Sequence, residues 1–168
     1  MAELELFGSG HLAAFAALLD DPDVLRFTRL PESPPPDYAE TWFAGYEAGR
    51  RDGTREAFAI VVAGTGEFAG IAVAPQIDAV ARTLELGYVV APAFRGRGVA
   101  TEALGLLTAW SFEEVGALRS ELFISVANEG SKVVAARCGY VREGVLRSVY
   151  VKDGRREDTE IWSRLPTD

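Results

Sequence analysis

The stretch Leu84 to Leu107 contains a short loop whose two arginines and two glycines could hold an anion. The loop leads from an apolar, β-rich segment straight into small residues at helical spacing, so backbone N–H groups stay unpaired at the positive end of a helix dipole. Such a place binds phosphate. Gly96 and Gly98 would let the backbone approach closely, and Arg95 and Arg97 supply charge and forked donors. The loop suits a pyrophosphate, although it also fits a simple connection between strand and helix.

Two common nucleotide-binding loops are excluded by the spacing of these residues. The letters GRGVAT lack the Lys-Ser/Thr end of a nucleoside triphosphate loop, and RGRGVA lacks the third glycine of a dinucleotide fingerprint. The anion would therefore belong to another kind of ligand.

Hydrophobic periodicity predicts the elements that position this loop. A strand at Leu4–Phe7 precedes an amphipathic helix at His11–Asp21, and a proline-rich loop leads into a second helix that ends at Gly53. Three β-rich runs follow, separated by turn residues that favour antiparallel pairing: Ala57–Ala63, Phe68–Ile77 and Arg82–Val90.

Beyond the loop, the pattern predicts a helix that ends near Gly116, a strand at Ser120–Asn128 and a short helix at Glu129–Tyr140. A hairpin at Gly144–Leu165 turns at Asp153-Gly154. The expected fold class is α/β (α+β), with a mixed, mostly antiparallel central sheet of about seven strands flanked by about four helices.

Composition and charge limit the function classes. With 168 residues and 48% hydrophobic content, the chain predicts a single domain over residues 1–168. The net charge of −8 argues against nucleic acid and anionic membranes as partners. The lone cysteine, Cys138, permits no internal disulfide or cysteine metal site and is expected to be a small buried hydrophobic residue. The N-terminal segment has acidic residues where a secretory signal needs basic ones, so the cytoplasm is the expected location.

The sequence resembles the GNAT family of N-acetyltransferases. In that family the pyrophosphate loop begins with Arg or Gln, has Gly three positions later, and has Gly or Ala two positions after that. This pattern is matched here by Arg95, Gly98 and Ala100. The segment Asn128 to Gly144 resembles the second signature, and the order of elements is that of the family. Within the family the chain is most similar to the branch that acetylates ribosomal-protein N-termini, whose members typically end this segment with Gly, an aromatic residue and Glu-Gly.

The resemblance implies a site for acetyl-CoA. By that resemblance the strand end at Val89 to Ala91 pairs with the pantetheine arm, the loop from Arg95 to Ala100 cradles the pyrophosphate, and Asn128 holds the arm from a neighbouring strand. The implied cofactor-binding residues are Val89, Val90, Ala91, Arg95, Gly96, Arg97, Gly98, Val99, Ala100, Asn128 and Ser131. From the residues alone, Asn128 equally fits an Asx turn or a helix cap.

Acetylation of an amine needs a base, an oxyanion donor and an acid. The base is required because an amine attacks a thioester only when deprotonated, and its pKa is near 8 for an α-amino group and about 10.4 for lysine. The strand end around Val90 offers a backbone N–H for the oxyanion. Glu85 is the candidate base because apolar neighbours would raise its pKa. Alternatively, Glu85 is an edge or surface carboxylate paired with an arginine, or a water relay removes the proton. The one histidine, His11, is expected at the surface of the first helix.

The candidate acid is Ser131, three residues after Asn128. Many family members carry a tyrosine seven residues after this asparagine, but that position here is Ala135. The ribosomal-protein branch has serine where Ser131 stands, and its hydroxyl could reach the sulfur. The alternative role for Ser131 is to cap the helix. Tyr88 and Tyr140 are possible substitutes as the acid, and are otherwise core residues.

The acceptor side is expected to be built by the irregular segments Arg26–Tyr38 and Tyr150–Asp158, since loops on a rigid scaffold usually carry specificity. Five acidic residues could form an entrance that attracts a cationic amine, or could simply be a solvated surface: Glu32, Asp37, Asp153, Glu157 and Asp158. Trp42, Phe43 and Tyr46 either wall an acceptor pocket or belong to the core.

The leading hypothesis is acetyl-CoA-dependent N-acetyltransfer to a primary amine, such as a protein N-terminus, by direct attack without a covalent enzyme intermediate. One alternative keeps this chemistry with a polyamine, aminoglycoside or amino acid derivative as acceptor, or with another acyl group such as succinyl. A second alternative is a non-catalytic acyl-CoA sensor. No metal is expected, and a homodimer through the sheet edge or the last hairpin follows only from the resemblance.

Overall fold

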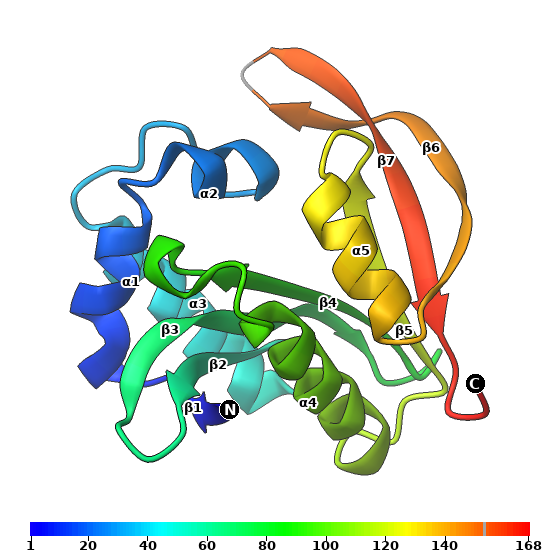
Figure 1. The fold of residues 1–168 in the computed structure, drawn as a ribbon, viewed down its shortest axis with the longest axis horizontal. Helices are drawn as coiled ribbons and strands as arrows, with labels where there is room; N and C mark the ends of the chain where they lie inside the picture. Colours follow the sequence, from blue (N-terminus) through cyan, green and yellow to red (C-terminus); the bar gives the residue numbers. More distant parts are fainter. Residues whose placement is uncertain (153) are drawn as a thin grey trace.

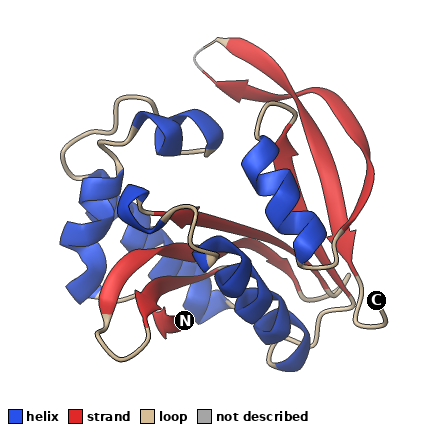
Figure 2. Cartoon of the chain, viewed as in Figure 1, coloured by secondary structure: helices blue, strands red, loops and turns tan. Residues whose placement is uncertain are grey.

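The computed structural model describes residues 1–152 and 154–168, whose strands form one sheet with helices against both faces (Figures 1 and 2). Asp153, assigned by sequence to the turn of the last hairpin and to an acidic entrance, lies outside the described residues. No helix in the described part of the chain has the length and apolar character needed to cross a membrane.

The strands are β1 (Ala2–Leu6), β2 (Glu56–Val62), β3 (Glu67–Asp78), β4 (Thr83–Val90), β5 (Arg119–Ser125), β6 (Val141–Lys152) and β7 (Arg155–Arg164). The α-helices are α1 (Leu12–Leu18), α2 (Pro22–Phe27), α3 (Tyr38–Asp52), α4 (Val99–Glu113) and α5 (Glu129–Arg137). Two short 3-10 helices are η1 (Ser9–His11) and η2 (Pro92–Phe94). The order of elements predicted from the sequence is confirmed, with one helix added.

The added element is α2, which follows the predicted first helix in a stretch where the sequence pattern predicted no helix. Asp21 caps it, because the Asp21 carboxylate accepts the N–H groups of Asp23 at 2.8 Å and Val24 at 3.2 Å. Pro22 occupies the first helical position, where its missing N–H is not needed. A helix of six residues is too short to show a helical period, so the described residues form five α-helices instead of about four.

The described strands form a seven-stranded sheet in the order β1-β2-β3-β4-β5-β7-β6. Every neighbouring pair is antiparallel except β4 and β5, which run parallel. A parallel pair needs a crossover connection, and the loop and α4 provide it. The mixed, mostly antiparallel sheet predicted from the sequence is confirmed.

Each face of the sheet has its own hydrophobic core. One core packs Leu84, Leu86 and Val90 of β4 against α4 and α5, and the other packs β2 and β3 against α1 and α3. In Figure 1, α4 and α5 lie in front of the sheet and α3 lies behind it. Because side chains alternate along a strand, Glu85 faces the α3 side while Tyr88 faces the α5 side.

The parallel pair separates soon after it begins. The residues from Thr83 to Glu85 pair with those from Arg119 to Glu121, and no further pairing between these strands occurs among the described residues. Both strands nevertheless continue, β4 to Val90 and β5 to Ser125. The divergence opens the sheet next to the loop that enters α4, and this opening positions the site.

Candidate active site

A cavity of about 800 Å³ occupies the opening between β4 and β5. Its walls include β4 from Glu85 to Val90, β5 from Leu122 to Ser125, the loop before α4 and the first turn of α5. A volume of this size falls in the range of cofactor and ligand sites. Of the residues assigned to the cofactor by sequence, Val89, Val90, Arg95, Gly96, Gly98, Val99, Ala100, Asn128 and Ser131 line it, whereas Ala91 and Arg97 do not.

The loop before α4 leaves an open place where backbone N–H groups could meet an anion. Gly96 and Gly98 have φ angles of +72° and +85°, which glycine adopts without strain. Gly98 is the N-cap of α4 and has no side chain, so the N–H groups of the first turn stay available. A Cβ added at either glycine would meet no described atom within 4 Å. The donors and the free space together suit a pyrophosphate.

Arg95 is engaged within the protein. Its Nε donates to the Val90 carbonyl at 3.0 Å, and one guanidinium nitrogen donates to Asp21 at 2.9 Å. Asp23 lies 3.5 Å from another nitrogen. Arg95 therefore ties the loop to the strand end and to α2, and its charge is balanced by these carboxylates. Arg97 is exposed, with its guanidinium 6.0 Å from the centre of the Phe94 ring.

The end of β4 presents backbone groups to the opening. The Ala91 N–H donates to the Ala69 carbonyl of β3 at 2.8 Å, so Ala91 is turned toward β3. Because hydrogen-bonding direction alternates along a strand, the N–H groups of Val90 and Tyr88 are turned toward the gap. The Val90 N–H, the candidate oxyanion donor, is therefore turned toward the gap.

Glu85 is both buried and paired with an arginine. Its side chain is 14% exposed, and its two oxygens lie 2.9 Å and 3.0 Å from the guanidinium nitrogens of Arg29, which follows α2. Burial raises the pKa of Glu85, the Arg29 charge lowers it, and the Glu121 charge on β5 raises it slightly. Sequence reasoning allowed burial or an arginine partner as alternatives, and both occur together. It missed Arg29 as that partner, since no local spacing links residues so far apart.

Asn128 and Ser131 meet at the start of α5 and line the cavity. The Asn128 side-chain oxygen accepts the Ser131 N–H at 3.1 Å, so Asn128 is the N-cap. The capping role considered for Ser131 is wrong, because its neighbour fills it. The Ser131 hydroxyl is consequently available to the cavity, and the cap holds the two side chains together.

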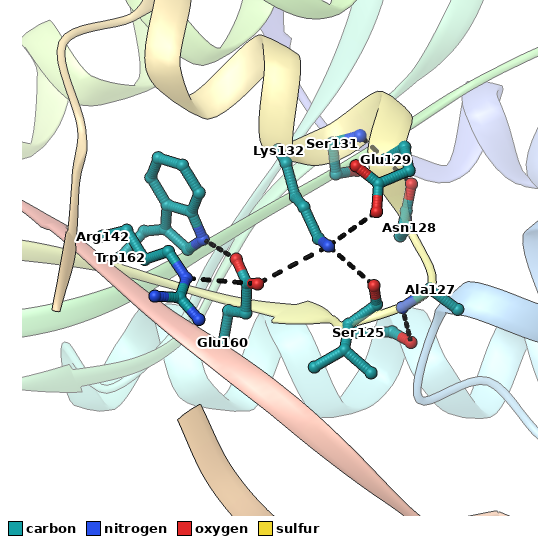
Figure 3. Close-up of polar contacts among 10 residues, drawn as sticks. Ser125, Ala127, Asn128, Glu129, Ser131, Lys132, Arg142, Glu160 and Trp162 are labelled. Atoms are coloured by element: carbon teal, nitrogen blue, oxygen red, sulfur yellow. Dashed lines mark hydrogen bonds and ion pairs between the residues drawn. The ribbon is translucent and has the colours of Figure 1, made fainter. Parts of the chain in front are cut away.

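A polar cluster behind this turn fixes the start of α5 to the sheet (Figure 3). The Lys132 ammonium donates to the Val126 carbonyl at 2.7 Å and lies 3.5 Å from the Glu160 carboxylate of β7. Glu160 also accepts the Trp162 indole N–H at 2.9 Å and lies 3.2 Å from Arg142. These contacts bind the end of β5, the first turn of α5 and β7 into one unit.

Of the remaining polar candidates, Tyr88 lines the cavity, whereas Tyr140, Cys138 and His11 do not. Tyr140 is 4% exposed, and its hydroxyl shares a hydrogen bond with Thr108 at 2.8 Å, so Tyr140 is a core residue. Cys138 is buried as predicted, and burial raises the pKa of its thiol. His11 does not line the cavity. In the described part of the chain, no three His, Cys, Asp or Glu side chains gather in a way that could hold a metal ion.

The end of the cavity near Glu85 is aromatic and carries little unpaired charge. Trp42 and Tyr46 of α3 line it and also pack in the core, with ring centres 4.3 Å apart. Phe43 instead packs against Phe7 in the core. The predicted acidic residues that the structure describes, Glu32, Asp37, Glu157 and Asp158, do not line the cavity. Its described carboxylates are Asp23 and Glu85, each beside an arginine.

Comparisons with known proteins agree with this geometry. The sequence model of the acetyltransferase (GNAT) domain matches residues 3–141. A curated relative, the putative ribosomal N-acetyltransferase YdaF of Bacillus subtilis, is 33% identical over 100 residues, which cover 60% of this chain and 55% of that protein. The chain spans about half the length of the curated relatives it matches.

Two solved structures show the same fold. RimL, a ribosomal L7/L12 alpha-N-protein acetyltransferase in complex with coenzyme A, has a TM-score of 0.89 at 19% identity, over 98% of this chain and 93% of that one. A spermidine N-acetyltransferase from Vibrio cholerae in complex with CoA and spermine has a TM-score of 0.87 at 20% identity, over 99% of this chain and 96% of that one. With the domain model matching most of the sequence and the sheet opening beside a glycine loop, this chain belongs to the GNAT acetyltransferase family.

Proposed function

We propose that the protein is an N-acetyltransferase that uses acetyl-CoA and acts on a primary amine. The observation that carries the proposal is one cavity that joins the open glycine loop at the start of α4 to the buried carboxylate of Glu85. An anion site and a base at opposite ends of one cavity suit a long phosphorylated donor and an amine that meet between them. The names of the similar proteins support the same chemistry.

The chain's own residues would hold the donor along the opening. The N–H groups at Gly98, Val99 and Ala100 would bind the pyrophosphate, and the backbone at Val90 and the side chain of Asn128 would flank the pantetheine arm. Acetyl-CoA supplies an acetyl group as a thioester. The free space at Gly96 and Gly98 supports this placement of the pyrophosphate.

Three groups would then carry the transfer. Glu85 accepts the proton that the acceptor nitrogen must lose, while the new C–N bond forms at the thioester carbonyl. The Val90 N–H stabilises the negative oxygen of the tetrahedral intermediate. As the C–S bond breaks and the sulfur leaves with the bonding pair, Ser131 gives it a proton, and the proton taken from the amine finally replaces it through solvent. The acetyl group thereby moves from the sulfur to the nitrogen, and the nitrogen loses one proton for the one that the sulfur gains.

The acceptor we propose is an N-terminal α-amine. A polyamine carries several positive charges, but among the described residues the cavity offers only the carboxylates of Asp23 and Glu85. Glu85 is paired with Arg29, and Asp23 shares Arg95 with Asp21. An α-amine presents one charge and is deprotonated more readily than lysine, since its pKa is near 8 against about 10.4. This favours a peptide over a polyamine.

The test is CoA thiol release from acetyl-CoA with N-terminal peptides, lysine peptides, spermidine, an aminoglycoside and amino acids as acceptors. We expect the fastest release with a peptide N-terminus, and loss of release in Gly98→Asp. Faster release with spermidine would overturn the acceptor but keep the reaction. A parallel assay with succinyl-CoA identifies a different acyl group. Tight binding of acetyl-CoA without release for any acceptor or acyl group would contradict an enzyme and indicate a sensor.

A further inference from the structure

The hydroxyl of Tyr88 is buried at the cavity without a hydrogen-bond partner. Its oxygen is shielded from solvent and makes no hydrogen bond of regular geometry with any described residue. The Tyr88 side chain lines the cavity and packs at the edge of the core on the α5 side of β4. A buried polar group left unpaired is rare in native proteins, because it loses its bonds to water without replacing them.

Ser131 lies beside this hydroxyl. Burial raises the pKa of Tyr88 to about 12, and a polar contact with the Ser131 side chain partly opposes this rise. Ser131, Ala135 and Cys138 recur at helical spacing and so occupy one face of α5 and its end. The fully buried Ala135 has no long side chain, so the tyrosine ring from β4 can pack against this face.

Building on the proposed function, we propose that Tyr88 is a positioning residue for Ser131. Its hydroxyl donates a hydrogen bond to the Ser131 oxygen, which directs the Ser131 proton at the sulfur of CoA. Chains of hydrogen bonds strengthen one another in a site shielded from water.

The chemical need for a second donor follows from the acidity of the groups. A serine hydroxyl is a far weaker acid than a thiol, whose pKa is near 8.5, so serine alone donates poorly to a leaving thiolate. Support from Tyr88 spreads the negative charge over two oxygens as the Ser131 proton moves to sulfur. With its raised pKa, Tyr88 remains a neutral donor at any pH where the reaction runs.

The deciding experiment titrates the thiol of CoA bound to the protein, followed by thiolate absorbance with the protein alone as blank. In Tyr88→Phe we expect the acid dissociation constant of the bound thiol to fall about tenfold, because the thiolate loses a supporting hydrogen bond. The same constant in the wild-type protein and Tyr88→Phe would overturn the inference and leave the proposed function standing. Failure of the wild-type protein to bind CoA would overturn both.

A double variant tests whether Tyr88 acts through Ser131. If it does, the acid dissociation constant of the bound thiol is the same in Ser131→Ala as in the double variant Tyr88→Phe/Ser131→Ala. The reason is that Ser131→Ala already removes the hydroxyl through which Tyr88 acts. A further fall in the double variant would overturn the relay. Turnover with the best acceptor should drop about tenfold in Tyr88→Phe, while the KM for acetyl-CoA is unchanged.

Tyr140→Phe is the matched control, because Tyr140 is another buried tyrosine but does not line the cavity. Tyr140→Phe removes a hydrogen bond to Thr108, so its Tm should fall by about 2–4 °C with the thiol constant unchanged. Tyr88→Phe removes a buried hydroxyl that makes no hydrogen bond of regular geometry with the described residues, so its Tm should be equal or higher. A fall in the Tm of Tyr88→Phe to match Tyr140→Phe would mean that the Tyr88 hydroxyl is structural, and would overturn the proposal.

Discussion

The Arg29 guanidinium holds both oxygens of the Glu85 carboxylate, at 2.9 Å and 3.0 Å, although 56 positions separate the two residues. The carboxylate is 14% exposed and the arginine 59% exposed. Burial raises the pKa of the candidate base, and this largely exposed cation partly opposes the rise.

Removing this cation should move the pH dependence of the reaction. The pKa of Glu85 is raised by burial and lowered by Arg29, so in Arg29→Met it rises further. Since the base works only when deprotonated, the acid limb of kcat/KM should move to higher pH by about one pH unit. Arg26→Met, an exposed arginine of α2, makes the same charge change and should leave the limb in place. Equal profiles for Arg29→Met and the wild-type protein would show that Glu85 does not limit the rate.

Replacing the base itself should affect turnover and spare the donor site. For Glu85→Gln we expect kcat to fall about 100-fold near neutral pH, with the difference shrinking at high pH as the amine loses its proton unaided. Acetyl-CoA affinity by calorimetry should be unchanged. Glu121→Gln, at the neighbouring position on β5, is the control for charge. A Glu85→Gln variant with wild-type kcat at every pH would assign the proton to a water relay.

The glycine loop gives a prediction about binding. In Gly98→Asp a carboxylate enters the open space at the start of α4, where the pyrophosphate is expected, so acetyl-CoA binding should be lost. Gly64→Asp controls for backbone strain, because Gly64 has a φ of +83° and the same open surroundings in the turn between β2 and β3. Calorimetry should find normal affinity in Gly64→Asp. Retained affinity in Gly98→Asp would rule out the assigned phosphate site.

The thermal stability of the protein should depend on pH through Glu143 in the last hairpin. Hydrogen bonds from Arg119 and from the Ser163 hydroxyl, the latter at 2.7 Å, lower the pKa of Glu143 from 4.5 to about 2. A carboxylate with a lowered folded-state pKa stabilises the protein fully above the unfolded value of 4.5, and this stabilisation is lost as the pH falls toward 2. Glu143→Gln should therefore lower the Tm at pH 7 and flatten its acid-induced decline.

The exposed carboxylate of Glu67, at the start of β3, provides the comparison for this titration. Glu67→Gln makes the same charge change and should keep the wild-type shape of Tm against pH. Superimposable curves for Glu143→Gln and the wild-type protein would mean that the bond network across β7 adds nothing to stability.

The sequence alone determined the features that depend on neighbouring residues. The order of strands and helices follows from hydrophobic period and turn residues, and the candidate anion site consists of neighbouring backbone groups at Gly96, Gly98 and the start of α4. Such features could be predicted because glycine conformation and helix ends are local properties of the chain.

Only the tertiary structure decided which distant side chains meet. The packing of separate elements brings Arg29 to Glu85, Asp21 to Arg95 and Tyr88 near Ser131. No spacing within the sequence encodes these pairs, since each depends on how two separate elements pack against the sheet. The identity of the candidate base and acid could be read from the chain, but their partners, and so their ionisation and orientation, are set by packing.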